Sequence, residues 1–140
     1  MDIFAFQGLR YQTDPILAGS RAGPPYDQID ETLRDRLHAD ENHFAHLVRP
    51  LGGGEEDPHR RAARLHEEWQ TNGVIQQDAG PSLYPYAIEL APGGARRLGL
   101  GALIGLEEPA SGVIRPHEQT VAKTVDERLG LAWISSPSWC

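Results

Sequence analysis

The residues of this sequence that are best suited to chemistry lie between positions 114 and 128. His117 and Glu118 are adjacent and follow a proline, which restricts the backbone of the turn that carries them. A carboxylate beside an imidazole can remove a proton from a hydroxyl, if burial raises its pKa or the hydroxyl lies within hydrogen-bond reach. The cations Lys123 and Arg128 follow shortly after. The segment therefore predicts proton abstraction next to a bound anion.

Phosphoryl transfer to a hydroxyl is a reaction that fits this set, because it needs a base, cations for the transferred group and exclusion of water. Under this hypothesis Glu118 is the catalytic base, and His117 orients it or contacts the substrate. The N-terminus of a helix that begins near Thr124 adds partial positive charge. The residues predicted to bind substrate or phosphate are His117, Thr120, Lys123, Arg128 and Asp27.

A structural interpretation of the same segment stays open. Thr124 and Glu127 have the spacing of a capping box, which is typical of a helix start. Lys123 and Arg128 are then solvated surface charges. The residue types alone do not separate the two interpretations.

Asp27 ends the run Pro-Pro-Tyr-Asp at 24–27, which predicts a stiff turn with an aromatic anchor. In the functional alternative, Asp27 lines the same cleft as Glu118 and binds a metal or a substrate amine. Both interpretations stay open.

Histidines and glycines give no independent site. His43 and His46 are expected in one strand, where their spacing directs them to opposite faces, and we expect the histidines at the surface. No metal site is predicted. Gly99 and Gly101 have neither the spacing nor the following helix of a dinucleotide loop, and they lie in a predicted strand, so we expect them to allow close packing against another element.

The elements that must position these residues combine helices and strands. Asp57 as N-cap, Pro58 at the first helical position and Gly73 at the end predict a helix, with Ala62, Leu65 and Trp69 buried. Other helices are predicted to begin at Asp30 and near Thr124. Strands are predicted at 3–6, 44–51, 74–75, 83–90 and 97–106, the last two joined by a turn at 92–94. The fold class is α+β in a single domain over 1–140, with three helices and a mixed, mostly antiparallel sheet.

Composition excludes several classes of protein. Thirteen Lys and Arg against 20 Asp and Glu give a net charge of −7, which argues against a nucleic-acid partner. The single Cys140 has no partner for an intrachain disulfide, and no apolar run is long enough to span a bilayer. We expect a cytoplasmic protein with a small-molecule substrate, and without a membrane or nucleic-acid partner.

Several motifs, in the same order, resemble the N-terminal part of a bacterial and archaeal family known as domain of unknown function 1015. The matching segments are 8–11, 24–27, 43–51, the helix with Trp69, 83–86 and 112–120. The Pro-His-Glu segment is similar to one in free-serine kinases of the ParB/sulfiredoxin-like fold. The resemblance implies an incomplete ParB/sulfiredoxin-like domain that uses ATP or ADP with magnesium, in which Glu118 is the base on the serine hydroxyl.

The sequence also departs from the family pattern. Full members are longer and carry a downstream Asp-Gly-His-His-Arg motif that is expected to bind phosphate, and no such motif occurs in these 140 residues. The comparison therefore implies the N-terminal portion of a longer family domain, which keeps the base and lacks part of the site. A nucleotide- or metabolite-binding regulatory protein without catalysis is the alternative.

Overall fold

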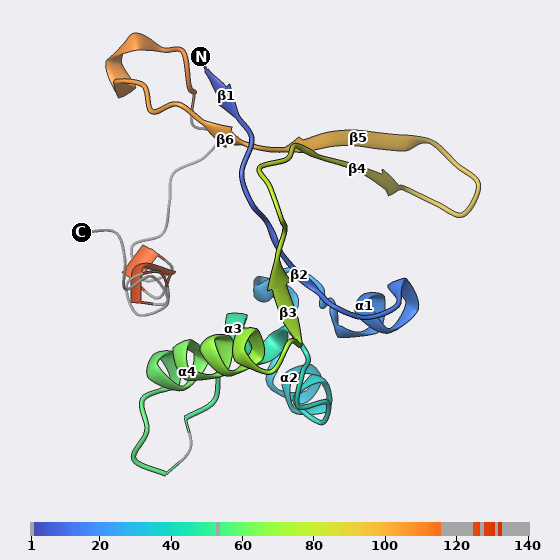
Figure 1. Ribbon diagram of the computed structural model, residues 1–140, viewed down its shortest axis with the longest axis vertical. Helices are drawn as coiled ribbons and strands as arrows, with labels where there is room; N and C mark the ends of the chain where they lie inside the picture. Colours follow the sequence, from blue (N-terminus) through green and yellow to red (C-terminus); the bar gives the residue numbers. More distant parts are fainter. Residues whose placement is uncertain (1, 53, 116–124, 127, 131, 133–140) are drawn as a thin grey trace. The chain divides into compact units, whose positions relative to one another are not determined.

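The computed structural model describes residues 2–52, 54–115, 125–126, 128–130 and 132, and its labelled elements are shown in Figure 1. Two compact units divide the chain. Unit 1 comprises Met1–Arg10 and Gln77–Gln119, and unit 2 comprises Tyr11–Gln76 and Thr120–Cys140. The division falls within the paired strands β2 (Leu9–Tyr11) and β3 (Ile75–Gln77). Helices and short antiparallel sheets together confirm the predicted α+β class.

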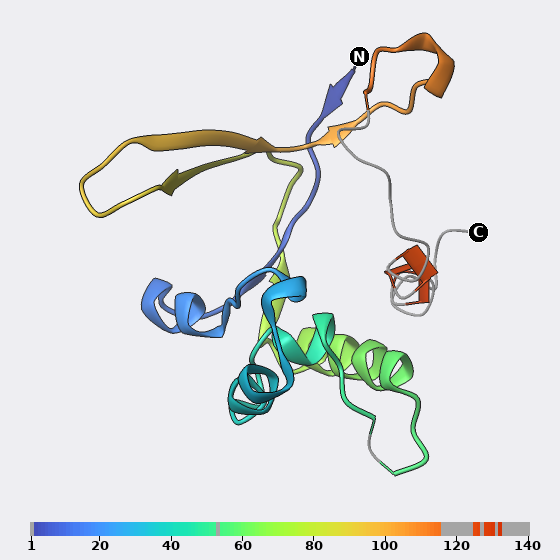
Figure 2. The ribbon, with the colours of Figure 1, turned by 180° about the vertical axis from the view of Figure 1, so that it is seen from behind.

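Unit 1 is built from short antiparallel strand pairs (Figure 2). Strand β1 (Ile3–Phe4) pairs with β6 (Leu103–Ile104), and β4 (Tyr84–Glu89) pairs with β5 (Arg96–Gly101). The predicted hairpin is therefore present, with Gly93 at a positive φ of 71° in its turn. The strand predicted over 97–106 is divided, because β5 ends at Gly101 and β6 then pairs with β1.

Two tyrosines of β4 lie opposite two glycines of β5. Tyr86 is paired with Gly99, and Tyr84 is paired with Gly101. A Cβ atom on Gly99 would overlap the ring of Tyr86. Close packing is thus the reason for this glycine, as predicted.

A hydrogen-bond network around Tyr84 ties β4 to the N-terminal segment of unit 1. Its hydroxyl accepts from the Gly8 amide at 2.6 Å and donates to Asp78 Oδ2 at 2.6 Å. Arg10 Nε donates to Asp78 Oδ1 at 2.8 Å, and the hydrogen bonds from Arg10 and then Tyr84 lower the pKa of Asp78. The hydrogen bond to the Asp78 carboxylate raises the pKa of Tyr84. The tyrosine ring is therefore held from two sides.

The strands of unit 1 leave much apolar surface exposed. Leu98 on β5 is 78% exposed. The exposed apolar residues of these strands are Ile3, Phe4, Tyr86, Ile88, Leu98, Leu100, Leu103 and Ile104.

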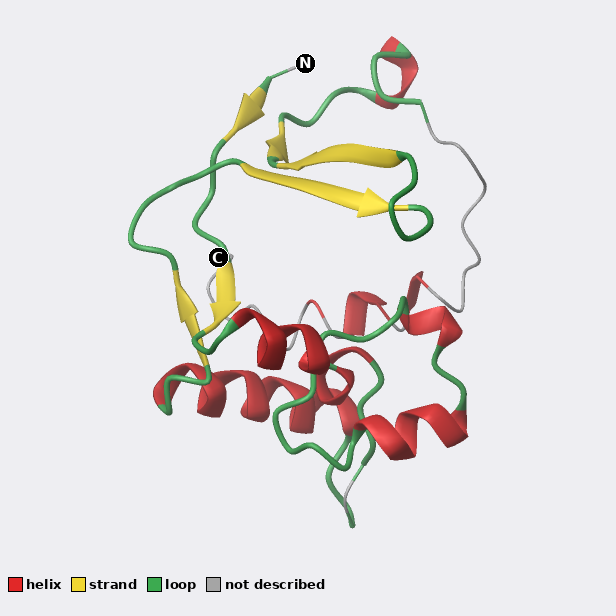
Figure 3. Cartoon of the chain, turned by 90° about the vertical axis from the view of Figure 1, so that its right-hand side faces the viewer, coloured by secondary structure: helices red, strands yellow, loops and turns green. Residues whose placement is uncertain are grey.

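Unit 2 is mainly helical (Figure 3). Its α-helices with bounds are α1 (Pro15–Arg21), α2 (Glu31–Leu37), α3 (Ala45–Val48) and α4 (Pro58–Thr71). The described residues between 125 and 132 are also helical. The prediction of three helices was therefore too low, since it omitted α1 and α3.

Helix α4 begins where its sequence signals place it. The Asp57 carboxylate accepts hydrogen bonds from the backbone amides of His59 and Arg60, and Pro58 needs no amide partner. Gly73 follows at φ 72°. The buried side chains of α4 are Ala62, Ala63 and Trp69, whereas the predicted Leu65 is only half-buried.

The strand predicted over 44–51 was wrong, because this segment begins with the short helix α3. Local polar contacts favour the turn: His43 Nδ1 accepts from the Ala45 amide at 3.0 Å, and the Phe44 amide donates to the Arg21 carbonyl at 2.9 Å. Ala45 is fully buried, and α3 packs against α4. A small buried residue allows this close approach.

Helix α1 was missed, although its start is well defined. Asp14 accepts from the amides of Ile16 and Leu17, and Pro15 occupies the first helical position. The buried apolar residues of the described chain are Ile29, Ala45, Ala62, Ala63, Trp69 and Ile75. Among the described residues, no helix combines the length and the apolar character that crossing a bilayer requires.

Candidate functional site

Most of the predicted site lies outside the described residues. This applies to the predicted base Glu118 and to His117, Thr120 and Lys123. Of the predicted set, the structure describes Arg128 and Asp27, both in unit 2.

Arg128 is held by two contacts. Its Nη2 donates to the Val48 carbonyl at 3.2 Å, and its guanidinium carbon lies 4.0 Å from the centroid of the Tyr26 ring. Its Nε atom is buried without a hydrogen-bond partner among the described residues. The Val48 carbonyl and the Tyr26 ring therefore hold the side chain in position.

Asp27 follows Tyr26 in the 3-10 turn η1 (Tyr26–Gln28), which begins after Pro25. The Gln28 amide donates to the Pro25 carbonyl at 2.9 Å, so the predicted turn is present. Asp27 is exposed, and no ion pair joins it to Arg128. The structure brings Arg128 to the neighbouring aromatic ring instead of to the carboxylate.

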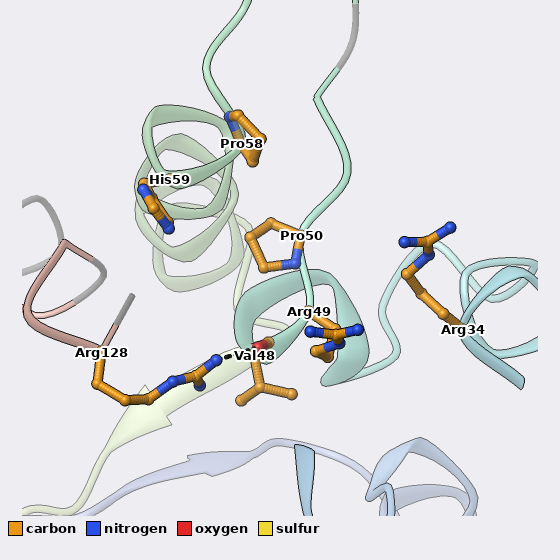
Figure 4. A pocket seen from close by; sticks show the side chains of 7 residues that line it. All are labelled: Arg34, Val48, Arg49, Pro50, Pro58, His59 and Arg128. Atoms are coloured by element: carbon orange, nitrogen blue, oxygen red, sulfur yellow. Dashed lines mark hydrogen bonds between the residues drawn. The ribbon is translucent and has the colours of Figure 1, made fainter. Parts of the chain in front are cut away.

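A pocket of about 260 Å³ lies beside Arg128 in unit 2 (Figure 4). It is formed where the end of α3 meets the first turn of α4, with α2 and the helical residues around 128 contributing one arginine each. The lining residues are Arg34, Val48, Arg49, Pro50, Pro58, His59 and Arg128. All of them are described residues of unit 2.

The charge of this pocket is positive, in contrast to the net charge of the chain. Three guanidinium groups and one imidazole line it, and none of the described lining residues is acidic. Arg34 Nη2 lies 3.3 Å from the exposed carboxylate of Asp35. Arg49 and Arg128 form no ion pair among the described residues. An anion would therefore meet two cations that no carboxylate of the described residues neutralises.

Arg49 shares a second property with Arg128. Its Nε atom is also buried and has no hydrogen-bond partner in the described part of the chain. Buried polar groups are usually paired, so these two Nε atoms are exceptions beside the pocket.

The first turn of α4 contributes little through its backbone. Asp57 already accepts hydrogen bonds from the amides of His59 and Arg60, which would otherwise face an anion. The Asp57 carboxylate also lies 3.9 Å from His59 Nδ1. The pocket therefore depends on its arginine side chains.

The half-buried His38 contacts the backbone of Arg49 beside the pocket and adjoins two buried histidines, His43 and His46. His38 Nε2 donates to the Arg49 carbonyl at 3.1 Å, and the rings of His38 and His46 are 4.0 Å apart. His43 and His46 are 3% and 8% exposed, so the prediction of surface histidines was wrong for this pair. His46 Nε2 donates to the Asp40 carbonyl at 3.1 Å, and His43 Nδ1 accepts from the Ala45 amide. His43 Nε2 is buried and has no hydrogen-bond partner among the described residues.

Burial determines the protonation of these rings. Desolvation lowers the pKa of His38 and of His43, and the nearby His46 lowers both further. Within the described residues, no group of three or more His, Cys, Asp or Glu side chains is placed to hold a metal ion. The histidines therefore support the fold next to the pocket.

Comparison with known proteins identifies the family. The family described as "Protein of unknown function (DUF1015)" matches residues 3–133. The chain belongs to this family. No curated protein and no solved structure gives a significant match. The family description assigns no activity, so the function of this DUF1015 chain must be argued from its own residues.

Sequence reasoning did not find Arg34, Arg49 or His59. These residues lie on different elements and are far from Arg128 in the sequence, so no local motif joins them. The error at 44–51 also hid the site, because Arg49 lies at the end of a helix that was predicted as a strand. The signal in the sequence that could have indicated a cationic site is the number of arginines within an acidic chain.

Proposed function

We propose that this DUF1015 chain takes part in phosphoryl transfer from ATP or ADP to a small hydroxyl compound of the free-serine class. The observation that supports this is the position of Arg128. The residue was predicted as a phosphate ligand, and it lines a cationic pocket together with Arg34 and Arg49. Clustered guanidinium groups suit the charge that phosphoryl transfer must neutralise.

In this proposal each residue has a defined task. Glu118 accepts the proton of the acceptor hydroxyl, whose oxygen then bonds to phosphorus while the bond to the nucleotide leaving group breaks. Arg128 neutralises phosphate oxygens. His117, Thr120 and Lys123 complete the substrate and phosphate contacts.

The bound magnesium nucleotide supplies the phosphoryl group. Magnesium in such sites is held mainly by phosphates and water, with one or two carboxylates. Asp27 is an exposed carboxylate that can provide one of these. An interaction of Asp27 with the amine of the acceptor is the other role that its chemistry allows.

Phosphoserine formation tests the proposal. The chain would be incubated with ATP or ADP, magnesium and free serine, and phosphoserine would be measured by mass spectrometry. We expect product from the wild type and from Glu108→Gln, an exposed control in unit 1, and none above background from Glu118→Gln. Equal background from all three would overturn the proposal.

Metabolite binding without catalysis is the second candidate. The observation in its favour is that the described residues of unit 2 bring three arginines and one histidine to a single pocket. Nucleotide or metabolite binding by the wild type, without phosphoserine formation, would support this candidate.

A further inference from the structure

The pocket of unit 2 has a size that limits its ligand. Pockets that enclose drug-sized molecules span roughly 300–1,000 Å³. The volume of about 260 Å³ lies below that range. None of the described lining residues is Phe, Tyr or Trp, and the nearby ring of Tyr26 is already covered by Arg128. The pocket therefore has room for a charged group with a small body.

The arrangement of donors limits the ligand further. Arg34 comes from α2, Arg49 follows α3, and Arg128 comes from the helical residues near 128, so their guanidinium groups reach the pocket from separate elements (Figure 4). A planar carboxylate is satisfied by one guanidinium in a bidentate pair. A phosphate monoester carries nearly two negative charges and three acceptor oxygens that point in different directions. Three arginines around one cavity match the phosphate better.

We infer that this pocket binds the phosphate group of a small phosphorylated metabolite, such as O-phosphoserine, with Arg49 and Arg128 as its principal ligands. Arg34 and His59 flank the group. The inference deepens the proposed function, since it assigns the pocket to the phosphorylated product and not to the nucleotide. Binding needs no turnover, so the two ideas can fail separately.

Calorimetric titration of the full chain tests this directly. The ligands would be O-phosphoserine, serine, acetate and ATP at one pH and low salt. We expect O-phosphoserine to bind at least about tenfold more tightly than serine or acetate, because each charge-assisted hydrogen bond contributes about 1.5–3 kcal/mol. Equal affinity for acetate and O-phosphoserine would overturn the inference.

Matched arginine variants locate the site. Arg49→Gln and Arg128→Gln should each weaken O-phosphoserine binding by about tenfold or more. Arg36→Gln on α2 and Arg60→Gln on α4 change exposed arginines next to the pocket-lining positions and should leave the affinity within about twofold. Unchanged binding in both Arg49→Gln and Arg128→Gln would contradict the assignment.

Two further variants keep the test decisive. If Arg49→Gln loses its fold by circular dichroism, Arg34→Gln removes a pocket cation at a helix surface and should still weaken binding severalfold. Glu108→Gln, an exposed control in unit 1, should bind O-phosphoserine as the wild type does. Product formation together with wild-type affinity in the arginine variants would reject this inference and leave the proposed function intact. Specific binding of O-phosphoserine without product formation would support this inference and reject the proposed function.

Discussion

The guanidinium group of Arg128 lies over the ring of Tyr26, with 4.0 Å between its central carbon and the ring centroid. This contact joins the helical residues near 128 to the turn that precedes α2, two segments far apart in the sequence. The ring shields one face of the cation, while the Val48 carbonyl accepts one of its donors. Tyr26 therefore positions a pocket residue without lining the pocket.

Replacing Tyr26 by leucine should weaken unit 2. A cation–π contact contributes about 0.5–1 kcal/mol at exposed sites and about 2 kcal/mol when desolvated. We expect Tyr26→Leu to lower the free energy of unfolding by about 1 kcal/mol in urea titrations. Tyr26→Phe keeps the aromatic face and should retain most of that stability, so equal losses in both variants would exclude the cation–π explanation.

Adding a methyl group at Gly8 should strain unit 1. A Cβ at this position would lie 2.9 Å from the Tyr84 ring, and the Asp78 hydrogen bond prevents that ring from moving away. We expect Gly8→Ala to cost about 1–3 kcal/mol, as overpacking usually does. Gly80→Ala is the control, because a Cβ there meets no atom within 4 Å. Similar unfolding midpoints for the two variants would contradict the packing argument.

Acid should destabilise unit 2 through its buried histidines. The folded-state pKa of His38 and of His43 is lowered from the ordinary value of 6.5, so the unfolded chain takes up these protons first as pH falls. The stability from the neutral rings is thus fully present above about pH 6.5 and is lost as pH falls towards the folded-state pKa. Urea titrations at several pH values should show this decline.

A histidine variant tests whether the buried rings cause this loss of stability at low pH. His43→Gln should flatten the dependence of unfolding free energy on pH below 6.5, because it removes a ring whose pKa is lowered in the folded state. A wild-type slope in His43→Gln would show that other groups govern the acid response.

Burial predicts opposite outcomes for two apolar substitutions. Ile75 on β3 is 6% exposed, so Ile75→Ala should cost about 2–5 kcal/mol. Leu98 on β5 is 78% exposed, and Leu98→Thr should change stability by no more than about 0.5 kcal/mol. Thermal unfolding of both variants measures the difference. A large loss at Leu98 would mean that this side chain is covered in solution.

The parts of the fold that could be predicted are those with local signals. Asp57 caps the start of α4 with its side chain, Pro58 fits the first helical position, and Gly73 follows its end. Alternating side chains define the β4–β5 hairpin. Asp30 likewise caps α2 as predicted, by accepting from the Leu33 amide. These signals act within a few residues and need no knowledge of the tertiary structure.

The parts that could not be predicted depend on tertiary contacts. The run at 44–51 is apolar enough for a strand, but the His43 ring and the buried Ala45 turn it into α3. The cationic pocket exists only because Arg49 then meets arginines from distant segments. The spacing of residues along the sequence does not indicate contacts between segments so far apart.

The tyrosine–glycine pairs of the β4–β5 hairpin also have a consequence for how this hairpin forms. Only the observed alignment places Tyr84 and Tyr86 both opposite glycine. A slip of two residues would keep the same faces but would set one tyrosine opposite Arg97 or Leu103. Misaligned hairpins therefore lose one ring-over-backbone contact each. Glycine is usually unfavourable within a strand, but Gly99 and Gly101 favour the native register of β4 and β5 over registers shifted by two residues.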